Sequence, residues 1–318
     1  MHNIVGALLC FLLLIPNVVM AEDYSGKRIL WLDSYHEAYE WNSGEGEGIQ
    51  NVIGKTKATL KIHRMDTKRN TSDEFKIAAG LKAKAVIEAF KPDIVIATDD
   101  NAQKYVVAKF YKDSDLPFVF AGVNWSADEY GYPYKNVTGM IEVNAAEELV
   151  DLLSGMAKGN RIGLLTSDVI TEHKDVEFTQ KLFNLKFETR YVVTFEEWKQ
   201  AFKEMQDQYD MLILQNNSGI EGWDKEEAKN FAVEYTKIPT GTYYDFMIPY
   251  AIVSYSKVAQ EQGKYAAETA LRILDGEKIS DMPIVKNQQG WVMVNARISI
   301  TSGIDVPADI LDVAEIVE

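Results

Sequence analysis

Side chains that could bind a small molecule follow several of the apolar segments in this 318-residue chain. Hydroxyl, amide, carboxylate and aromatic groups predominate at these positions, whereas Lys and Arg are almost absent. Such a set suits a neutral or amine-bearing molecule that stacks on aromatic rings, and it suits a phosphorylated ligand poorly. The candidate ligand-binding residues are Tyr35, His36, Trp41, Thr98, Asp99, Asp100, Asn124, Trp125, Ser167, Asn216, Asn217, Tyr243 and Asp245.

Each candidate also has an ordinary structural role open to it. Tyr35, Trp41 and Trp125 carry large rings that pack loops as readily as they contact a ligand. Asp99 follows an apolar strand, so it is also suited to cap a helix. The polar segment 216–218 is typical of a cap or a turn as well as of a ligand contact.

The sequence predicts neither catalysis nor a metal or other cofactor. His36 and Glu40 have helical spacing for a metal, but no second histidine lies nearby in the sequence. The segment 54–56 resembles the end of a phosphate-binding loop, yet position 49, where that motif needs glycine, is Ile49. Neither a Gly-x-Ser-x-Gly motif nor a zinc-type cysteine spacing occurs. A secreted hydrolase with a Ser-His-Asp triad drawn from distant loops is the enzymatic alternative.

Composition narrows the class of partner. The chain carries 33 Lys and Arg against 48 Asp and Glu, a formal net charge of −15. Nucleic acids and anionic lipids attract clustered cations, so the acidic balance argues against both. A content of 47% hydrophobic and 25% charged residues indicates a folded protein, and the length favours two lobes over one core.

Residues 1–21 have the features of a secretory signal peptide. They contain no Lys, Arg, Asp or Glu, and an apolar run from Ile4 to Ile15 ends at Pro16. Cleavage is predicted near Ala21, with an uncleaved anchor as the alternative. Cys10, the single cysteine, lies inside this segment. The mature chain is therefore predicted to be periplasmic or secreted, free of disulfides and not embedded in a membrane.

The remaining chain alternates apolar strands with amphipathic helices, which predicts parallel sheets covered on both faces. Two such series, separated near 139–144, indicate two similar α/β lobes. In an open α/β sheet, ligands bind beyond the carboxyl ends of the strands, where the candidate residues fall. Strands are predicted at 28–32, 59–65, 92–97, 117–121, 161–165, 187–193, 210–214 and 291–298, and helices at 71–90, 173–184, 195–208, 224–235 and 257–274.

Several segments resemble one known family. Leu32-Asp33-Ser34-Tyr35-His36-Glu37-Ala38-Tyr39-Glu40-Trp41 resembles the start of ABC-transporter-type periplasmic substrate-binding proteins. Further matches are Ile94-Val95-Ile96-Ala97-Thr98, Phe118-Val119-Phe120-Ala121-Gly122-Val123-Asn124, Ser254-Tyr255-Ser256, Gln262-Gly263, Val294-Asn295 and Gly303-Ile304. The resemblance covers nearly the whole mature chain. Related modules also serve as sensor domains of bacterial membrane kinases and cyclases.

This resemblance implies a type I periplasmic-binding-protein fold, with two Rossmann-like lobes joined by three crossovers. It implies an N-terminal lobe of 22–140 plus 252–281 and a C-terminal lobe of 141–251 plus 282–318. The implied function is capture of a small molecule by hinge closure and its delivery to an ABC permease, with a membrane histidine kinase or diguanylate cyclase as the alternative partner. The ligand is expected to be amine-bearing or aromatic, and the protein a monomer. The segment 166–172 departs from the Asn- and Ser-rich loop of amino-acid carriers.

Overall fold

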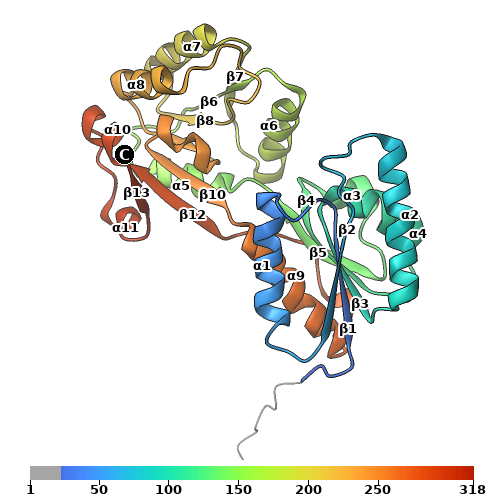
Figure 1. Cartoon of the computed structure of the whole chain (residues 1–318). Coiled ribbons are helices and arrows are strands. Elements are labelled where there is room, and N and C mark those ends of the chain that lie inside the picture. The colour runs from blue at the N-terminus through green and yellow to red at the C-terminus, as the bar shows by residue number, and fades with distance from the viewer. Residues whose placement is uncertain (1–22) are drawn as a thin grey trace, which may run out of the picture.

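The computed structural model describes residues 23–318, so the predicted signal peptide lies outside the described residues. The chain forms two lobes, each built on one sheet (Figure 1). In the first sheet every strand pair is parallel, in the order β11-β5-β4-β3-β1-β2. Its strands are β1 (Arg28–Asp33), β2 (Thr59–Arg64), β3 (Ile94–Thr98), β4 (Phe118–Asn124), β5 (Val137–Glu142) and β11 (Val285–Lys286).

The second sheet has the order β13-β12-β10-β9-β8-β6-β7. Its pairs are parallel except for β10 with β12, which run antiparallel. Its strands are β6 (Ile162–Ser167), β7 (Glu188–Val192), β8 (Met211–Leu214), β9 (Thr240–Thr242), β10 (Val253–Lys257), β12 (Gly290–Asn295) and β13 (Glu315–Val317).

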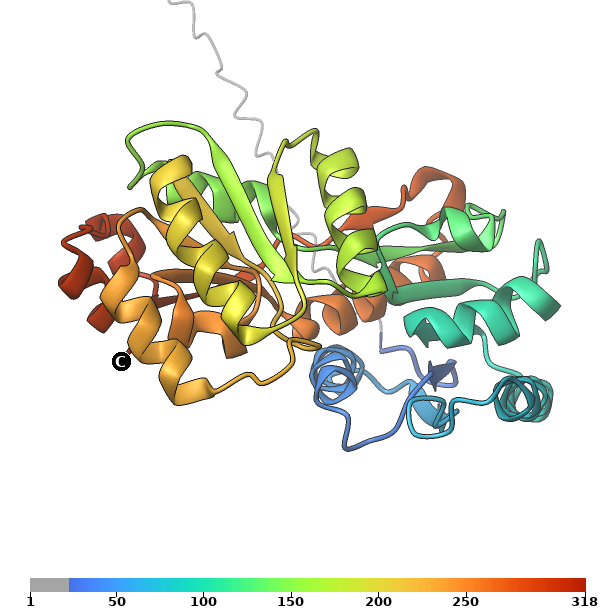
Figure 2. The ribbon, with the colours of Figure 1, turned by 90° about the horizontal axis from the view of Figure 1, so that it is seen from above.

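Helices cover both faces of each sheet, as the view from above shows (Figure 2). In the first lobe Ile29 and Trp31 of β1 enter a core beneath α1 and α9, whereas Leu30 and Leu32 enter a second core beneath α2. This alternation follows the two-residue period of a strand. The helices are α1 (Glu40–Ile53), α2 (Asp73–Phe90), α3 (Asp99–Ala102), η1 (Gln103–Val107), α4 (Ala108–Phe110), η2 (Ala127–Tyr130), α5 (Ala146–Ser154), α6 (Ile170–Phe183), α7 (Phe195–Gln208), α8 (Lys225–Tyr235), η3 (Asp245–Tyr250), α9 (Ala259–Leu274), η4 (Ile279–Asp281), α10 (Ala296–Ser302) and α11 (Ala308–Leu311).

The chain passes between the lobes three times: after β5, between β10 and α9, and between β11 and β12. The predicted α/β class, with two parallel-sheet lobes and three crossovers, is therefore confirmed. Strand β10 pairs within the second sheet and β11 within the first. The lobe limits stay a prediction, which we revise to follow the sheets: 23–142 plus 258–287 for the first lobe, and 143–257 plus 288–318 for the second.

Several predicted elements begin or end at other residues in the structure, as two examples show. The helix predicted at 257–274 begins at Ala259, because residues up to Lys257 extend β10. The strand predicted at 291–298 ends at Asn295, whose side chain accepts a hydrogen bond from the Ile298 amide and so caps α10.

Helix α1 has no counterpart among the predicted helices, because glycines at 44, 46 and 48 lower its intrinsic helix propensity. Packing explains these glycines. A Cβ on Gly48 would lie 2.6 Å from the Lys264 amide nitrogen of α9, and one on Gly263 of α9 would overlap the Glu45 carbonyl. Helices α1 and α9 therefore approach each other closely enough for backbone to contact backbone.

We expect Gly263→Ala to lower the free energy of unfolding by about 1–3 kcal/mol, because the new methyl group must push α9 away from α1. Urea denaturation measures the change. Gly155→Ala is the matched control, since its Cβ would meet no atom closer than 3.5 Å. Equal stability of the two variants would contradict close packing of these helices.

Candidate functional site

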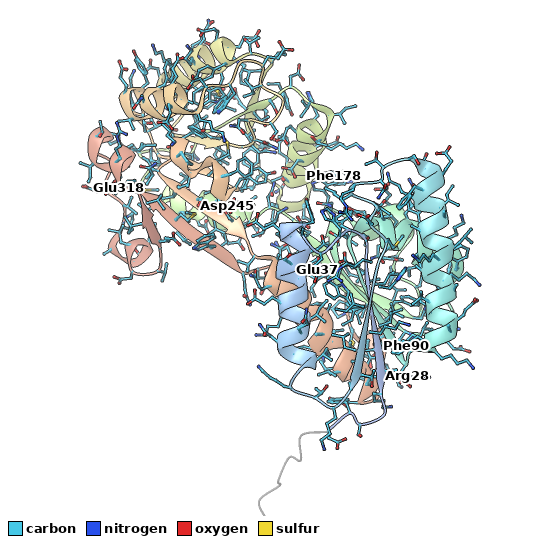
Figure 3. The ribbon with its side chains drawn as sticks, viewed as in Figure 1. Arg28, Glu37, Phe90, Phe178, Asp245 and Glu318 are labelled. Atoms are coloured by element: carbon cyan, nitrogen blue, oxygen red, sulfur yellow. The ribbon has the colours of Figure 1, made fainter. Side chains whose placement is uncertain are left out.

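A cleft of about 770 Å³ lies between the two lobes. Figure 3 labels Glu37 on the first lobe and Asp245 on the second, at the sides that face each other. The volume falls within the range typical of small-molecule sites. The lining residues are Tyr35, Tyr39, Glu40, Trp41, Ser43, Gly44, Glu47, Lys68, Asp99, Asn124, Glu142, Tyr243, Tyr244, Asp245, Phe246, Ser256, Lys257, Val258, Ala259, Gln260 and Trp291.

Six candidate residues from the sequence line this cleft. Five of them follow β1, β3 or β9 or end β4, as expected for a cleft at strand ends, and Trp41 lies in the first turn of α1. Whether they contact a ligand stays a prediction. The six are Tyr35, Trp41, Asp99, Asn124, Tyr243 and Asp245.

Three first-lobe candidates lie outside the lining. His36 faces Asp66, with 3.9 Å between Nδ1 and Oδ1. Thr98 is fully buried and accepts a hydrogen bond from the Trp31 indole at 3.2 Å. Asp100 accepts hydrogen bonds from Asn124 at 2.8 Å and from the Tyr130 hydroxyl at 2.6 Å. These side chains support the cleft wall.

Three second-lobe candidates also lie outside the lining. The Ser167 hydroxyl donates to the Ser218 carbonyl at 2.8 Å. Asn216 donates to Glu172 at 3.0 Å, and the Asn217 carbonyl accepts the Ile220 amide at 3.1 Å. The polar groups that end or follow β6 and β8 therefore form hydrogen bonds within the second lobe and do not line the cleft.

Trp125 forms a contact between the lobes instead of lining the cleft. Its indole stacks on Phe178 of α6, with ring centroids 5.6 Å apart and planes 6° apart. Its Nε1 donates to Asp175 Oδ1 at 2.7 Å, and Asp175 Oδ2 accepts from Asn144 and Gln215. In Figure 3, Phe178 lies at the side of α6 toward the first lobe. This group connects the lobes beside the cleft.

Buried carboxyl groups lie at the floor of the cleft. Asp33 forms an ion pair with Arg64, and Glu142 forms one with Lys257. Asn42 of α1 bridges two of the acids, donating to Asp33 Oδ1 at 2.6 Å and Asp99 Oδ2 at 2.8 Å. Asp99 itself adopts the left-handed conformation, with φ of +63°, a departure that clusters at functional sites.

Burial dominates the electrostatics of this floor. It raises the pKa of Glu142, although the neighbouring Lys257 ammonium acts in the opposite direction. It raises the pKa of Asp99 well above the usual range, a shift opposed by the Asn42 hydrogen bond and increased by Glu142. A cation that enters the cleft would therefore stabilise carboxylates that the protein leaves short of positive charge.

Two buried hydroxyl groups also point to a ligand. Tyr243 and Ser256 line the cleft and are only 2% and 7% exposed. Neither hydroxyl has a hydrogen-bond partner among residues 23–318. Buried polar groups are normally paired, so these two are available to a molecule in the cleft.

Several lining residues were missed from the sequence, among them Tyr39, Glu142, Lys257 and Trp291. Glu142 could have been found, because it ends strand β5, but the segment was interpreted as the boundary between lobes. Lys257 was interpreted as the start of a helix, whereas it ends β10. Trp291 comes from β12, far along the chain, and no local pattern marks it.

No set of three or more His, Cys, Asp or Glu side chains in the described chain is placed to hold a metal ion. Within residues 23–318 no helix is both long and apolar enough to span a membrane. The cleft lining contains two cations that could bind a phosphate group, Lys68 and Lys257. Lys68 faces the Tyr35 and Tyr39 rings at 4.9 and 4.7 Å, and Lys257 is paired with Glu142.

Two α/β lobes joined by three crossovers, with a polar, aromatic cleft between them, have the architecture of the type I periplasmic-binding-protein fold. The chain belongs to the ABC transporter substrate binding protein family, whose model matches residues 35–318. No protein of curated function matches the chain in sequence.

Solved structures share the fold. A ligand-free, open substrate binding protein with adhesive properties from Clostridium difficile has a TM-score of 0.71 at 17% identity, covering 92% of this chain and 99% of that one. An ABC domain from Streptococcus pneumonia in complex with L-Trp has a TM-score of 0.54 at 19% identity, covering 92% and 100%. A periplasmic ribose ABC transporter protein from Conexibacter woesei has a TM-score of 0.54 at 12% identity, covering 86% and 93%.

We expect Trp125→Phe to lower the free energy of unfolding by about 1–3 kcal/mol, because buried Asp175 loses the indole donor while ring stacking is retained. Thermal and urea denaturation measure the loss. Trp291→Phe is the control, since that ring is 44% exposed and should change stability little. An equal loss of unfolding free energy in the two variants would mean that the hydrogen bond from Trp125 to Asp175 does not stabilise the protein.

Proposed function

We propose that the mature protein is a periplasmic or secreted solute-binding protein that captures an amine-bearing, aromatic small molecule between its lobes. On this proposal, hinge closure encloses the ligand, and the closed form delivers it to an ABC permease. The observation that carries it is the interlobe cleft, with its floor of buried carboxyl groups and walls of aromatic rings. Family membership supports the role in solute binding.

The walls favour an aromatic ligand. Both lobes contribute rings to the lining, so closure would bring rings of the first lobe toward rings of the second. Stacked or edge-on aromatic pairs contribute about 0.5–1.5 kcal/mol beyond the area that they bury. The rings are Tyr35, Tyr39 and Trp41 from the first lobe and Tyr243, Tyr244, Phe246 and Trp291 from the second.

The charges favour an amine. Five carboxyl groups and two lysines line the cleft, and both lysines already face partners of the protein itself. Asp99 is only 2% exposed and forms no ion pair within residues 23–318, so it is the best-placed acceptor for an ammonium group. The L-Trp of the Streptococcus pneumonia complex has both an aromatic ring and an ammonium group, which fits this ligand class.

Thermal denaturation with a small panel tests the ligand class. Tryptamine and tyramine carry a ring and an amine, indole-3-acetate carries a ring and a carboxylate, and L-tryptophan carries all three. An amine at a hundredfold over its Kd should add about 2.7 kcal/mol of stability, or about 4 °C in Tm. Indole-3-acetate should add nothing. A larger rise in Tm with indole-3-acetate than with tryptamine or tyramine would contradict the proposal.

We expect Asp99→Asn to weaken the binding of a stabilising amine by about 10–100-fold, because a neutral amide cannot replace the charge-assisted hydrogen bond. Isothermal titration calorimetry measures the Kd. Asp245→Asn is the matched control, since that carboxylate lines the same cleft but is exposed, and its loss should change Kd by less than about threefold. Equal effects at the two positions would remove Asp99 as the amine acceptor.

The partner is tested by the genes that lie beside this one. A permease and an ATPase encoded there support delivery to an importer. A membrane histidine kinase or diguanylate cyclase in their place would contradict it and favour a sensory role.

A further inference from the structure

Behind the floor of the cleft lies a carboxyl group that binding alone does not require. Glu45, on the buried face of α1, is fully buried and lies outside the cleft lining. Neither of its carboxyl oxygens meets the full hydrogen-bond criteria with a partner among residues 23–318. Burial raises the pKa of Glu45, and the nearby Thr98 hydroxyl acts to lower it by a smaller effect. An ionised carboxylate in this condition is costly, because the side chain is fully buried and has no counter-charge among the described residues.

Glu45 is close to Asp99. A Cβ on Gly122 of β4 would overlap Glu45 Oε1 and lie 3.1 Å from Asp99 Oδ1, so both carboxyl groups border the same point. Gly122 has φ of +66°, which independently favours glycine there. The missing side chain leaves room for the two acids to approach.

The buried acids differ in whether a cation lies beside them. Asp33 has Arg64 and Glu142 has Lys257 as ion-pair partners, whereas no ion pair to Glu45 or Asp99 forms within the described chain. Helix α9, packed on α1, brings the Gly263 backbone to Glu45 and the Gln262 amide to Gly122, but no cation. The groups that face the pair are Asp33 on β1, Tyr35 after β1, Thr98 on β3, Asp100 on α3 and Glu142 on β5.

Two neighbouring carboxyl groups without a cation repel each other when both are ionised, so one of them favours its protonated form. Burial, and then the proximity of Asp99, raises the pKa of Glu45 well above its usual range. Asp99 is the member that lines the cleft, so it can meet a ligand while Glu45 stays behind it.

We propose that Glu45 and Asp99 hold one proton between them in the free protein, and that a ligand cation entering the cleft displaces this proton to solvent. The cation then supplies the positive charge that the pair lacks. Ligand uptake is thereby linked to pH, since binding a cation and binding the proton compete. The displacement step rests on the proposed amine binding, whereas the shared proton does not.

Infrared spectroscopy of the ligand-free protein at pH 7 tests the shared proton. The C=O stretch of a protonated carboxylic acid should be present in the wild type and absent from Glu45→Gln. Glu268→Gln, an exposed substitution on α9, is the control and should retain the band. If Glu45→Gln does not fold, Asp99→Asn should shift the frequency of the band, because the buried Glu45 carboxyl group would no longer face a second acid. A wild-type spectrum without the band overturns the proposal.

Stability against pH gives a second readout. Because folding raises these pKa values, the associated stability is fully present below the unfolded pKa, near 4.5 for Glu45, and is lost as pH rises through the folded value. The Tm of Glu45→Gln should therefore exceed that of the wild type at pH 9 and match it at pH 5. A difference that does not change with pH contradicts a shared proton.

Calorimetric titration with tryptamine in phosphate and in Tris buffer tests the displacement. The wild type should release close to one proton per tryptamine at pH 7, and Glu45→Gln should release none. Tight binding without proton release overturns the coupling. Absence of tryptamine binding overturns the proposed amine ligand and the coupling together, while the infrared band still decides whether the proton is shared.

Discussion

The close approach of α1 to α9 is the contact on which the rest of the structure depends. Glycines on both helices remove the side chains that would hold them apart, so backbone meets backbone. Helix α9 returns from the second lobe and packs on the first, and α1 carries Asn42 and Glu45 into the floor of the cleft. A separation wide enough for ordinary side chains would withdraw both residues from the acids that they face.

This packing also explains why polar groups are tolerated in the core. Asn42 donates hydrogen bonds to both Asp33 and Asp99. Asp33 also forms an ion pair with Arg64, and Glu142 forms one with Lys257, so most of the buried charge is compensated. Compensation is incomplete at Glu45 and Asp99. On the proposed function, an amine-bearing ligand in the cleft would supply the positive charge that these two acids lack.

The two lobes contribute unequally to the site. Polar groups at the first-lobe strand ends reach the cleft, whereas Ser167, Asn216 and Asn217 of the second lobe form hydrogen bonds with Ser218, Glu172 and Ile220 of their own lobe. The second lobe instead provides rings and hydroxyls from the end of β9, from η3 and from β10. Trp125 belongs to the contact between the lobes, because it stacks on Phe178 of α6 and donates a hydrogen bond to Asp175.

The sequence by itself determined the α/β class, the two lobes, the acidic balance and six cleft residues, because apolar strands and their polar ends are local patterns. It did not predict α1, whose glycines oppose a helix in isolation and are explained by packing against Trp31 of β1 and against α9, which lies more than 200 residues later. Glu142 at the end of β5 was interpreted as part of the boundary between the lobes, and Lys257 at the end of β10 as the start of a helix. Strand pairing with distant parts of the chain, which decides both, is not visible in the local sequence. Only the tertiary structure decided which carboxyl groups have a cation and which do not, because ion pairs such as Glu142 with Lys257 join residues that are distant in the chain.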